Sequence, residues 1–355
     1  MGIAENEEDT RSPLEVTIHT VTLALTTFFS LAGNSLVCLA LHRNRRLRTT
    51  INFYVLSLAV ADITLAVFFP FHLAASWLRG WPFGYVFCQF VGFLVQFWAQ
   101  VSLSILTLAS INRYVCVLKP LKYPVFFDKK KTVLSIISVW LFTFLQTLCL
   151  TIATPITFRW FPKNLYCQGT SPDKRTERAI YIFFGCFFTV PMLLVIFCYG
   201  SIYRVVKKHN TTIVPALQST NHLRTISAQE IKTSRVIFAA VLGYCVCWTP
   251  LTFLLFLVFG FRVTISPAAQ WVFVEITTFF SWINPIIYGV MNRSMRREFR
   301  NIVSWRTVHY GPAAILVPNV PSGQALRQDQ VGLEKITTNM EKEANKHSNP
   351  HKQVH

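Results

Sequence analysis

Seven long apolar stretches constrain this chain more than any other feature of its sequence. They cover residues 17–41, 51–76, 86–118, 133–155, 178–205, 231–259 and 267–290. A helix needs roughly 20 apolar residues to cross the hydrocarbon core of a bilayer. Because backbone amides inside lipid must find partners within their own segment, we expect each stretch to be an α-helix. The prolines inside them are expected to kink these helices rather than end them, namely Pro70, Pro191, Pro250 and Pro285.

Composition and charge support a membrane protein. Hydrophobic residues make up 52% of the 355 residues and charged residues only 14%, whereas about a quarter of a soluble chain is usually charged. The net charge of +18 would suggest nucleic acid binding in a soluble protein. Here the basic residues lie next to the ends of apolar stretches, which favours contact with anionic membrane lipid. We therefore predict a multi-pass plasma-membrane protein with no nucleic-acid partner.

The basic residues also predict an orientation. They gather after the first, third, fifth and seventh stretches, at 43–48, 119–131, 207–224 and 293–300. The positive-inside rule puts these segments in the cytoplasm and the N-terminus outside the cell. Residues 1–16 are then an extracellular N-terminus with no recognisable signal peptide, and 17–303 form the membrane domain. Residues 304–355 are polar, which predicts a disordered cytoplasmic tail.

One further helix is expected after the last span. In the segment 292–303, Met295, Phe299 and Ile302 recur at helical spacing with arginines between them. This pattern is typical of an amphipathic helix that lies flat on the inner leaflet.

Polar side chains inside the spans are costly in lipid, so each is a functional candidate. Five lie near mid-membrane: Asn34, Asp62, Ser102, Ser281 and Asn284. We expect them to form one buried cluster, in which Asp62 either takes up a proton or recruits a sodium ion. A switching role is favoured for Asp62. A purely structural hydrogen-bond network is the alternative, and it is favoured for Asn34.

Three motifs carry a family resemblance. The third span ends in Asn112-Arg113-Tyr114, the sixth contains Cys247-Trp248-Thr249-Pro250, and the seventh ends in Asn284-Pro285-Ile286-Ile287-Tyr288. In order and position these resemble the Asp-Arg-Tyr, Cys-Trp-x-Pro and Asn-Pro-x-x-Tyr signatures of rhodopsin-like G-protein-coupled receptors. The resemblance covers 17–303. It implies an all-α seven-transmembrane bundle, an extracellular ligand and a heterotrimeric G protein, with receptor kinases and arrestin as further partners.

The resemblance suggests an activation switch. Arg113 needs a partner while the bundle is closed, and Glu230, at the start of the sixth span, is a candidate latch for it. Release of the latch lets the sixth helix swing outward and expose a groove for the G protein. Glu230 can equally be an ordinary acidic helix start. The sequence departs from the family pattern at Asn112, which stands where the family usually has Asp.

Asn112 cannot neutralise Arg113 as an Asp does. Either basal activity is raised or other contacts compensate. Melatonin receptors also carry Asn at this place.

Other parts of the switch have structural alternatives. Trp248 is expected to act as a lever below the ligand, with Pro250 as the hinge, or else simply to fill the core. Tyr199 and Tyr288 are expected to fill the inner bundle after opening, or to be ordinary buried tyrosines. Pro285 and Tyr114 complete the motifs.

The resemblance also implies a disulfide. Cys88 begins the third span and Cys167 lies in the second extracellular loop. Both face an oxidising compartment, where such bonds persist. The bond would pin the loop across the entrance to the pocket.

The outer halves of the helices form the ligand pocket in this family. Val95 stands where amine receptors have an Asp, which disfavours an ordinary biogenic amine, and Thr278 stands where opsins have a Lys, which excludes a retinal Schiff base. The other candidates are mainly aromatic or neutral: His72, Gln96, Gln100, Tyr181, Phe183, Phe187, Trp248, Leu251, Thr252 and Glu275. They favour a small neutral or lipophilic ligand. Glu275 either binds a cation in the pocket or is a protonated structural residue, His72 is either a pocket or an interhelical residue, and short peptide ligands remain open.

Two other classes of function fit less well. A transporter usually shows repeats or a continuous polar path, and neither is evident. An enzyme needs paired carboxylates or a metal-binding motif, and the acidic residues Asp62 and Glu275 lie in different spans. Apart from sodium as a modulator, no cofactor or metal is expected.

Overall fold

The computed structural model describes residues 11–162, 166–208, 228–261, 263 and 266–304. A few side chains inside the helices are outside this description, including those of Tyr181, Glu230 and Leu251. The segment predicted as a tail, 304–355, lies outside it except for Ser304.

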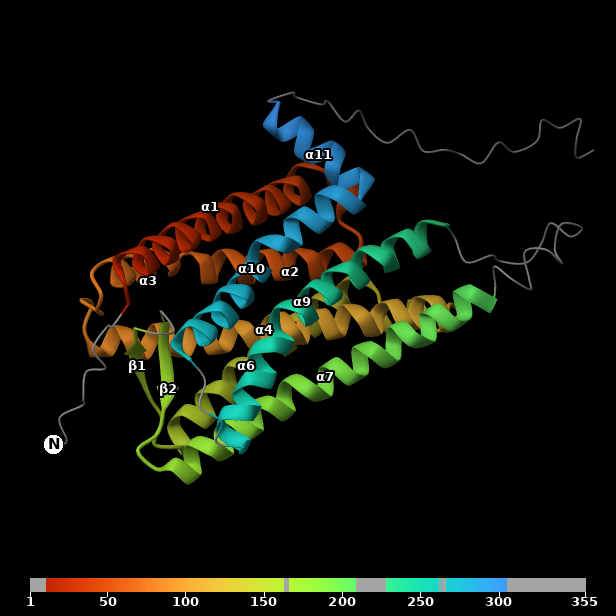
Figure 1. The fold of residues 1–355 in the computed structure, drawn as a ribbon. Coiled ribbons are helices and arrows are strands. Elements are labelled where there is room, and N and C mark those ends of the chain that lie inside the picture. The colour runs from red at the N-terminus through yellow and green to blue at the C-terminus, as the bar shows by residue number, and fades with distance from the viewer. Residues whose placement is uncertain (1–10, 163–165, 209–227, 262, 264–265, 305–355) are drawn as a thin grey trace, which may run out of the picture. The chain divides into compact units, whose positions relative to one another are not determined.

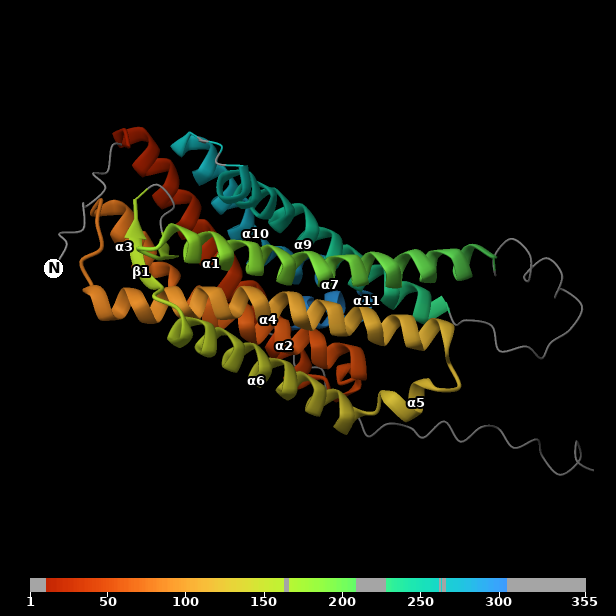
Figure 2. The same ribbon diagram turned by 90° about the horizontal axis from the view of Figure 1, so that it is seen from below.

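Long helices dominate the described residues (Figures 1 and 2). They are α1 (Pro13–Arg43), α2 (Thr50–Ala66), α3 (Phe69–Trp77), α4 (Tyr85–Leu118), α5 (Tyr123–Phe126), α6 (Lys129–Ala153), α7 (Lys174–Lys208), α9 (Ala228–Phe261), α10 (Pro267–Met291) and α11 (Arg293–Val303). A single 3-10 turn, η1 (Arg45–Leu47), joins α1 to α2, and the strands β1 (Thr157–Phe161) and β2 (Tyr166–Thr170) pair as an antiparallel hairpin. The hairpin lies at one end of the bundle, here called the hairpin end, and α11 lies at the other, the α11 end.

Polar caps carry several helices beyond their apolar stretches. At α1 the Ser12 hydroxyl accepts a hydrogen bond from the amide of Glu15 (3.2 Å), and the Glu15 carboxylate accepts one from the amide of Ser12 (2.6 Å). This reciprocal arrangement satisfies amides that a helix start leaves unpaired. At α6 a single bond caps the helix start: the Asp128 side chain accepts a hydrogen bond from the amide of Lys131. The caps explain why α1 and α6 begin four residues before the predicted spans at 17 and 133.

The seven-transmembrane helix bundle predicted from the sequence is confirmed. Six spans within the described residues are long and apolar enough to cross a membrane, with α2 and α3 together making the second. The seventh is α10, a helix of 25 residues with Pro285 inside it. The amphipathic helix expected at 292–303 is present as α11, whose start is capped by the side chain of Asn292.

The prolines divide into two kinds. Pro191, Pro250 and Pro285 lie inside the continuous helices α7, α9 and α10, as expected. At Pro70 the prediction of a kink rather than an end is wrong, because α2 ends at Ala66 and α3 begins at Phe69. Proline has no amide hydrogen, and its ring clashes with the carbonyl four residues earlier, here that of Ala66.

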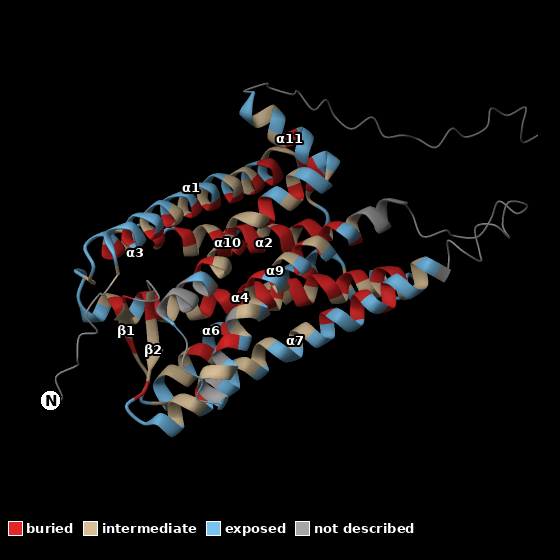
Figure 3. Ribbon diagram, in the orientation of Figure 1, coloured by how far each residue is buried: buried red, intermediate tan, exposed pale blue. Residues whose placement is uncertain are grey.

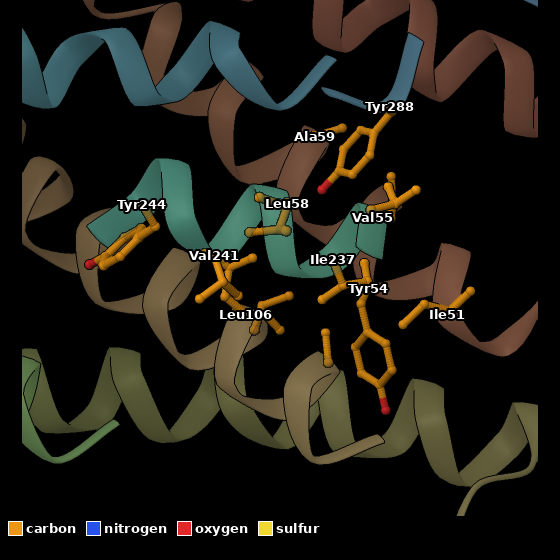
Figure 4. Close-up of a cluster of buried hydrophobic side chains, with 14 of the residues drawn as sticks. Ile51, Tyr54, Val55, Leu58, Ala59, Leu106, Ile237, Val241, Tyr244 and Tyr288 are labelled. Carbon is orange, nitrogen blue, oxygen red and sulfur yellow. The ribbon is translucent and has the colours of Figure 1, made fainter. Parts of the chain in front are cut away.

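The core lies around α4, which packs against α2, α6, α7, α9 and both strands. In Figure 3 buried residues follow α4 along its length, whereas α7 shows much exposed surface. The main apolar cluster joins α2, α4, α9 and α10 (Figure 4), with Tyr54, Leu106 and Tyr288 each at most 1% exposed. Exposed apolar side chains on the outer helices, such as Phe142 of α6 at 64%, are what a lipid-facing surface requires.

Candidate functional site

The β-hairpin is fixed to the start of α4 by a covalent bond and by hydrogen bonds. A disulfide joins Cys88 of α4 to Cys167 of β2, which confirms that prediction. Gln89 adds two bonds to the backbone of Phe158 in β1: its amide group donates to the carbonyl, and its Oε1 accepts from the amide hydrogen at 2.9 Å. Gly92 leaves room for this docking, since a Cβ there would lie 2.4 Å from the Phe158 ring and 2.7 Å from the carbonyl oxygen of Cys167.

A cavity of about 780 Å³ lies under the hairpin. It is lined by residues of α1, α2, α3, α4, α6, the hairpin, α7, α9 and α10, and it reaches from Phe158 and Cys167 to Trp248 and Asp62. Within the described part of the chain its lining includes no Lys or Arg, whereas Asp62, Glu177 and Glu275 contribute carboxyl groups. Such a cavity suits a neutral or cationic ligand and disfavours an anion, because a buried anion needs a partner of opposite charge.

Aromatic rings shape two parts of this cavity. Near the hairpin, His72 is 3% exposed, its ring stacks with Trp160 of β1 at 6.4 Å, and its Nε2 has no hydrogen-bond partner among the described residues. Deeper in, the Trp248 ring is stacked between Phe188 of α7 (5.5 Å) and Tyr244 one turn earlier in α9 (5.6 Å). Trp248, a cavity-lining residue of α9, thus packs directly against α7.

Two groups of hydrogen bonds join polar residues of different spans. The Asn34 side chain donates to the backbone carbonyls of Ser30 (3.0 Å) and Ser281 (2.7 Å), which ties α1 to α10. The Asn284 amide donates to Oδ2 of Asp62 at 3.2 Å, which ties α10 to α2. All five predicted members of the cluster are buried, and Ser102 and Ser281 line the same cavity as Asp62.

Arg113 lies near the α11 end of α4 and is only 5% exposed. Its Nε and Nη2 donate to Oδ1 of Asn112 at 3.1 and 2.6 Å, and Nη2 also donates to the hydroxyl of Tyr123 in α5 at 3.4 Å. The Asn112 Nδ2 donates to the same hydroxyl at 3.4 Å. Asn112, Arg113 and Tyr123 therefore form a closed group of hydrogen bonds, which we call the Arg113 triad.

Comparison with known proteins decides the family. Residues 33–288 match the family model described as 7 transmembrane receptor (rhodopsin family). The chain belongs to this family. It is therefore a G-protein-coupled receptor and a multi-pass membrane protein, not an enzyme.

The alignments with known proteins span most of this chain and most of each relative. The receptor is 30% identical to melatonin receptor type 1A of Phodopus sungorus over 286 residues, which is 79% of this chain and 78% of that protein. It is 31% identical to G-protein coupled receptor 54 of Oreochromis niloticus over 317 residues, 83% of this chain and 81% of that protein. The crystal structure of squid rhodopsin has the same fold, with a TM-score of 0.73 and 21% identity over 84% of this chain and 87% of that one.

The receptor's cavity includes seven of the predicted ligand-binding residues: His72, Val95, Gln96, Trp248, Thr252, Glu275 and Thr278. The side chains of Tyr181 and Leu251 lie outside the described residues. Three others are placed differently from the prediction. Gln100 is fully buried against α6, where it donates to Thr147 (3.4 Å) and accepts from Gln146 (3.0 Å). Phe183 is 44% exposed on α7, and Phe187 is absent from the described lining, its ring meeting that of Phe188 edge-on at 6.4 Å.

Some residues of the predicted activation switch contact neighbouring helices in the structure. Tyr199 of α7 packs on Phe238 of α9 at 5.1 Å, and Tyr114 lies 5.8 Å from Phe197 of α7. The Tyr288 hydroxyl is buried without a hydrogen-bond partner among the described residues. The side chain of the predicted latch Glu230 lies outside the description, although residue 230 is in the first turn of α9.

Tyr123 and Phe188 were missed by the sequence analysis. Tyr123 follows Arg113 by ten residues and belongs to none of the motifs. Only the short helix α5 (Tyr123–Phe126) brings its hydroxyl to Arg113. Phe188 lies in an almost wholly apolar run, where periodicity does not distinguish the lining face from the lipid-facing one.

Proposed function

We propose that this receptor lies in the plasma membrane with its hairpin end outside the cell and that it binds a small neutral or lipophilic ligand in the cavity. The described basic segments 43–48, 119–131 and 293–300 lie at the opposite end, as the positive-inside rule requires of a cytoplasmic face. The main support for this ligand class is the cavity, which extends from the hairpin to Trp248 and has no Lys or Arg in its described lining. The likeness to melatonin receptors supports this ligand class.

Activation of a heterotrimeric G protein is proposed to follow from movement of α9. A ligand that displaces Trp248 acts on the stack of Phe188, Trp248 and Tyr244, and Pro250 lies two residues further along α9. A proline inside a helix removes a hydrogen bond and allows bending. Bending there swings the α11 end of α9 outward and opens a groove for the G protein. Receptor kinases and arrestin are proposed to act on the segment 304–355.

The Asp62 cluster is proposed to set the resting balance. Asp62, Ser102 and Ser281 all line the cavity with oxygen-bearing side chains, and oxygen is the ligand that hard cations prefer. A sodium ion bound there holds α2, α4 and α10 together in the resting state, as the Asp62–Asn284 hydrogen bond already does for α2 and α10.

The experiment that tests this function is basal second-messenger output in transfected cells. Asn112→Asp is expected to lower that output, because a carboxylate bonds the Arg113 guanidinium roughly twice as strongly as a neutral amide oxygen does. If the gain is about 1.4 kcal/mol, output falls about tenfold. Glu230→Ala is expected to raise output by removing the proposed latch. Silence of wild type and both variants at equal surface levels would contradict coupling.

Amine binding is a second candidate, favoured by one observation: Glu275 lines the cavity and is 5% exposed. Melatonin as a neutral probe and histamine as a cationic probe distinguish the two, each tested for thermal stabilisation of the purified receptor. If the ligand is neutral, melatonin stabilises wild type and Glu275→Gln alike, and histamine has no effect. If histamine alone stabilises wild type and Glu275→Gln abolishes this, the ligand is an amine.

A further inference from the structure

A second hollow lies on the outside of the bundle, between α1 and α2. It has a volume of about 620 Å³ and is lined by Ser35, Cys38, Leu39, Leu41, His42, Arg48, Asn52, Phe53, Leu56 and Ile63. We call it the α1–α2 groove. Leu39 is 41% exposed, and Ser35 and His42 are also exposed, so the groove opens away from the core. In a membrane protein this surface faces lipid, so a lipid is the occupant to consider.

The groove has an apolar part and a basic end. Leu39, Phe53, Leu56 and Ile63 offer apolar side chains along its length, whereas His42 and Arg48 lie where α1 ends and η1 leads into α2. No Asp or Glu occurs among its described lining residues. An acyl chain suits the apolar part and an anionic headgroup suits the basic end.

Arg48 is held in place at this end. Its Nε donates to the carbonyl of Leu41 at 2.9 Å and its Nη2 donates to the carbonyl of His42 at 2.6 Å. These carbonyls belong to the last turn of α1, where a helix has no partners of its own for them. Neither bond uses Nη1, so the guanidinium keeps donors for a phosphate, which arginine binds well.

Glu298, the acidic residue that contacts the end of α1, is engaged with α1 residues outside the groove. Glu298 of α11 is 1% exposed, lies 4.0 Å from Arg43, and accepts a hydrogen bond from Asn44 at 3.3 Å. Arg43 is thereby paired with a carboxylate of α11. Glu298 is not among the lining residues of the groove. The basic end therefore keeps the charge of Arg48, with the exposed Arg45 and Arg46 of η1 beside it.

We propose that the α1–α2 groove binds one anionic phospholipid of the inner leaflet, with its phosphate on Arg48 and an acyl chain along Phe53 and Leu56. The term inner leaflet rests on the proposed orientation. Binding itself does not, and it is measured without signalling, so failure of either proposal leaves the other standing.

The test uses the full-length receptor in phosphatidylcholine nanodiscs that contain a minority of phosphatidylserine with a photoactivatable acyl chain. After irradiation, labelled peptides are identified by mass spectrometry. Labelling is expected within 35–63 and is expected to fall about fivefold in Arg48→Gln, since one basic residue near an anionic surface contributes about that factor. The matched control is Lys130→Gln, which removes an exposed basic residue of α6 at the same end and should leave this labelling unchanged.

A second variant guards against misfolding of Arg48→Gln, whose side chain also caps α1. Ser35→Trp fills the groove from the exposed face of α1 without changing charge, and it should also reduce labelling within 35–63. Photoactivatable phosphatidylcholine at the same concentration should label this segment several-fold less. Equal labelling by the two lipids would show a groove for any lipid, and undiminished labelling in Ser35→Trp would show that the groove is not the site; either result overturns the proposal.

Discussion

Replacing Cys88 with serine is expected to remove most of the correctly folded receptor from the cell surface. The disulfide with Cys167 closes a loop across a sequence separation of 79 residues. Native disulfides typically contribute about 2–4 kcal/mol to stability. That is a large part of the 5–15 kcal/mol by which folded proteins are typically stable. Cys167→Ser should have the same effect, because either change breaks the same bond.

The comparison is of surface level, by antibody to an N-terminal epitope, and of thermal stability after purification. Cys149→Ser is the matched control, because Cys149 is an exposed, unpaired cysteine in α6. It should behave as wild type. If Cys88→Ser also reached wild-type surface level and stability, the two Gln89 hydrogen bonds to Phe158 would be sufficient to dock the hairpin, and our account of the disulfide would be wrong.

The length and order of the helices could be predicted from the sequence because the bilayer imposes a simple rule. A backbone that crosses lipid must be helical, so apolar length alone locates the spans. The same reasoning found α11 from its alternation of arginines with Met295, Phe299 and Ile302. The hairpin β1–β2 was not predicted. The docking of Phe158 against Gln89 and Gly92 is a tertiary contact, and local pattern does not encode it.

The rotation of each helix about its axis was harder to predict than its length. In a soluble protein the polar face of a helix marks the outside, but on a membrane helix both faces are apolar. Phe183 was predicted in the pocket and is exposed on α7, while Phe188 was overlooked and stacks on Trp248. Polar residues were more informative: Asp62 and Asn284, far apart in the sequence, were expected together and share a hydrogen bond.

The Arg113 triad shows a different limit. The sequence indicated that Asn112 cannot neutralise Arg113 and that Glu230 is the candidate partner. In the structure Asn112 nevertheless accepts two hydrogen bonds from the guanidinium, and Tyr123 adds a third. Hydrogen bonds to a charged group contribute roughly 1.5–3 kcal/mol each. Neutral groups therefore accept hydrogen bonds from Arg113 where the family usually has a carboxylate, and the basal output of Asn112→Asp decides between raised activity and compensation.

Arg113→Ala is expected to abolish G-protein activation while leaving the receptor at the surface. The change removes the guanidinium that is proposed to leave the triad when α9 moves and to contact the G protein in the opened groove, so the active state loses this contact. We expect basal output to fall at least about tenfold, equivalent to 1.4 kcal/mol. The measurement is G-protein dissociation in transfected cells, normalised to surface level. Arg297→Ala, which removes an exposed arginine of α11, is the control and should retain wild-type output.

Tyr123→Phe gives the opposite result if the triad holds the resting state. It removes only the hydroxyl to which both Arg113 and Asn112 donate. Both bonds are long, at 3.4 Å, so they are weaker than a well-formed bond to a charged group, and losing about 1 kcal/mol of restraint should raise basal output about fivefold. A receptor in which Arg113→Ala signals as wild type does would show that activation does not pass through Arg113. If Tyr123→Phe lowered output instead, the triad would belong to the active state, and the resting receptor would have to be held by Glu230 or the Asp62 cluster.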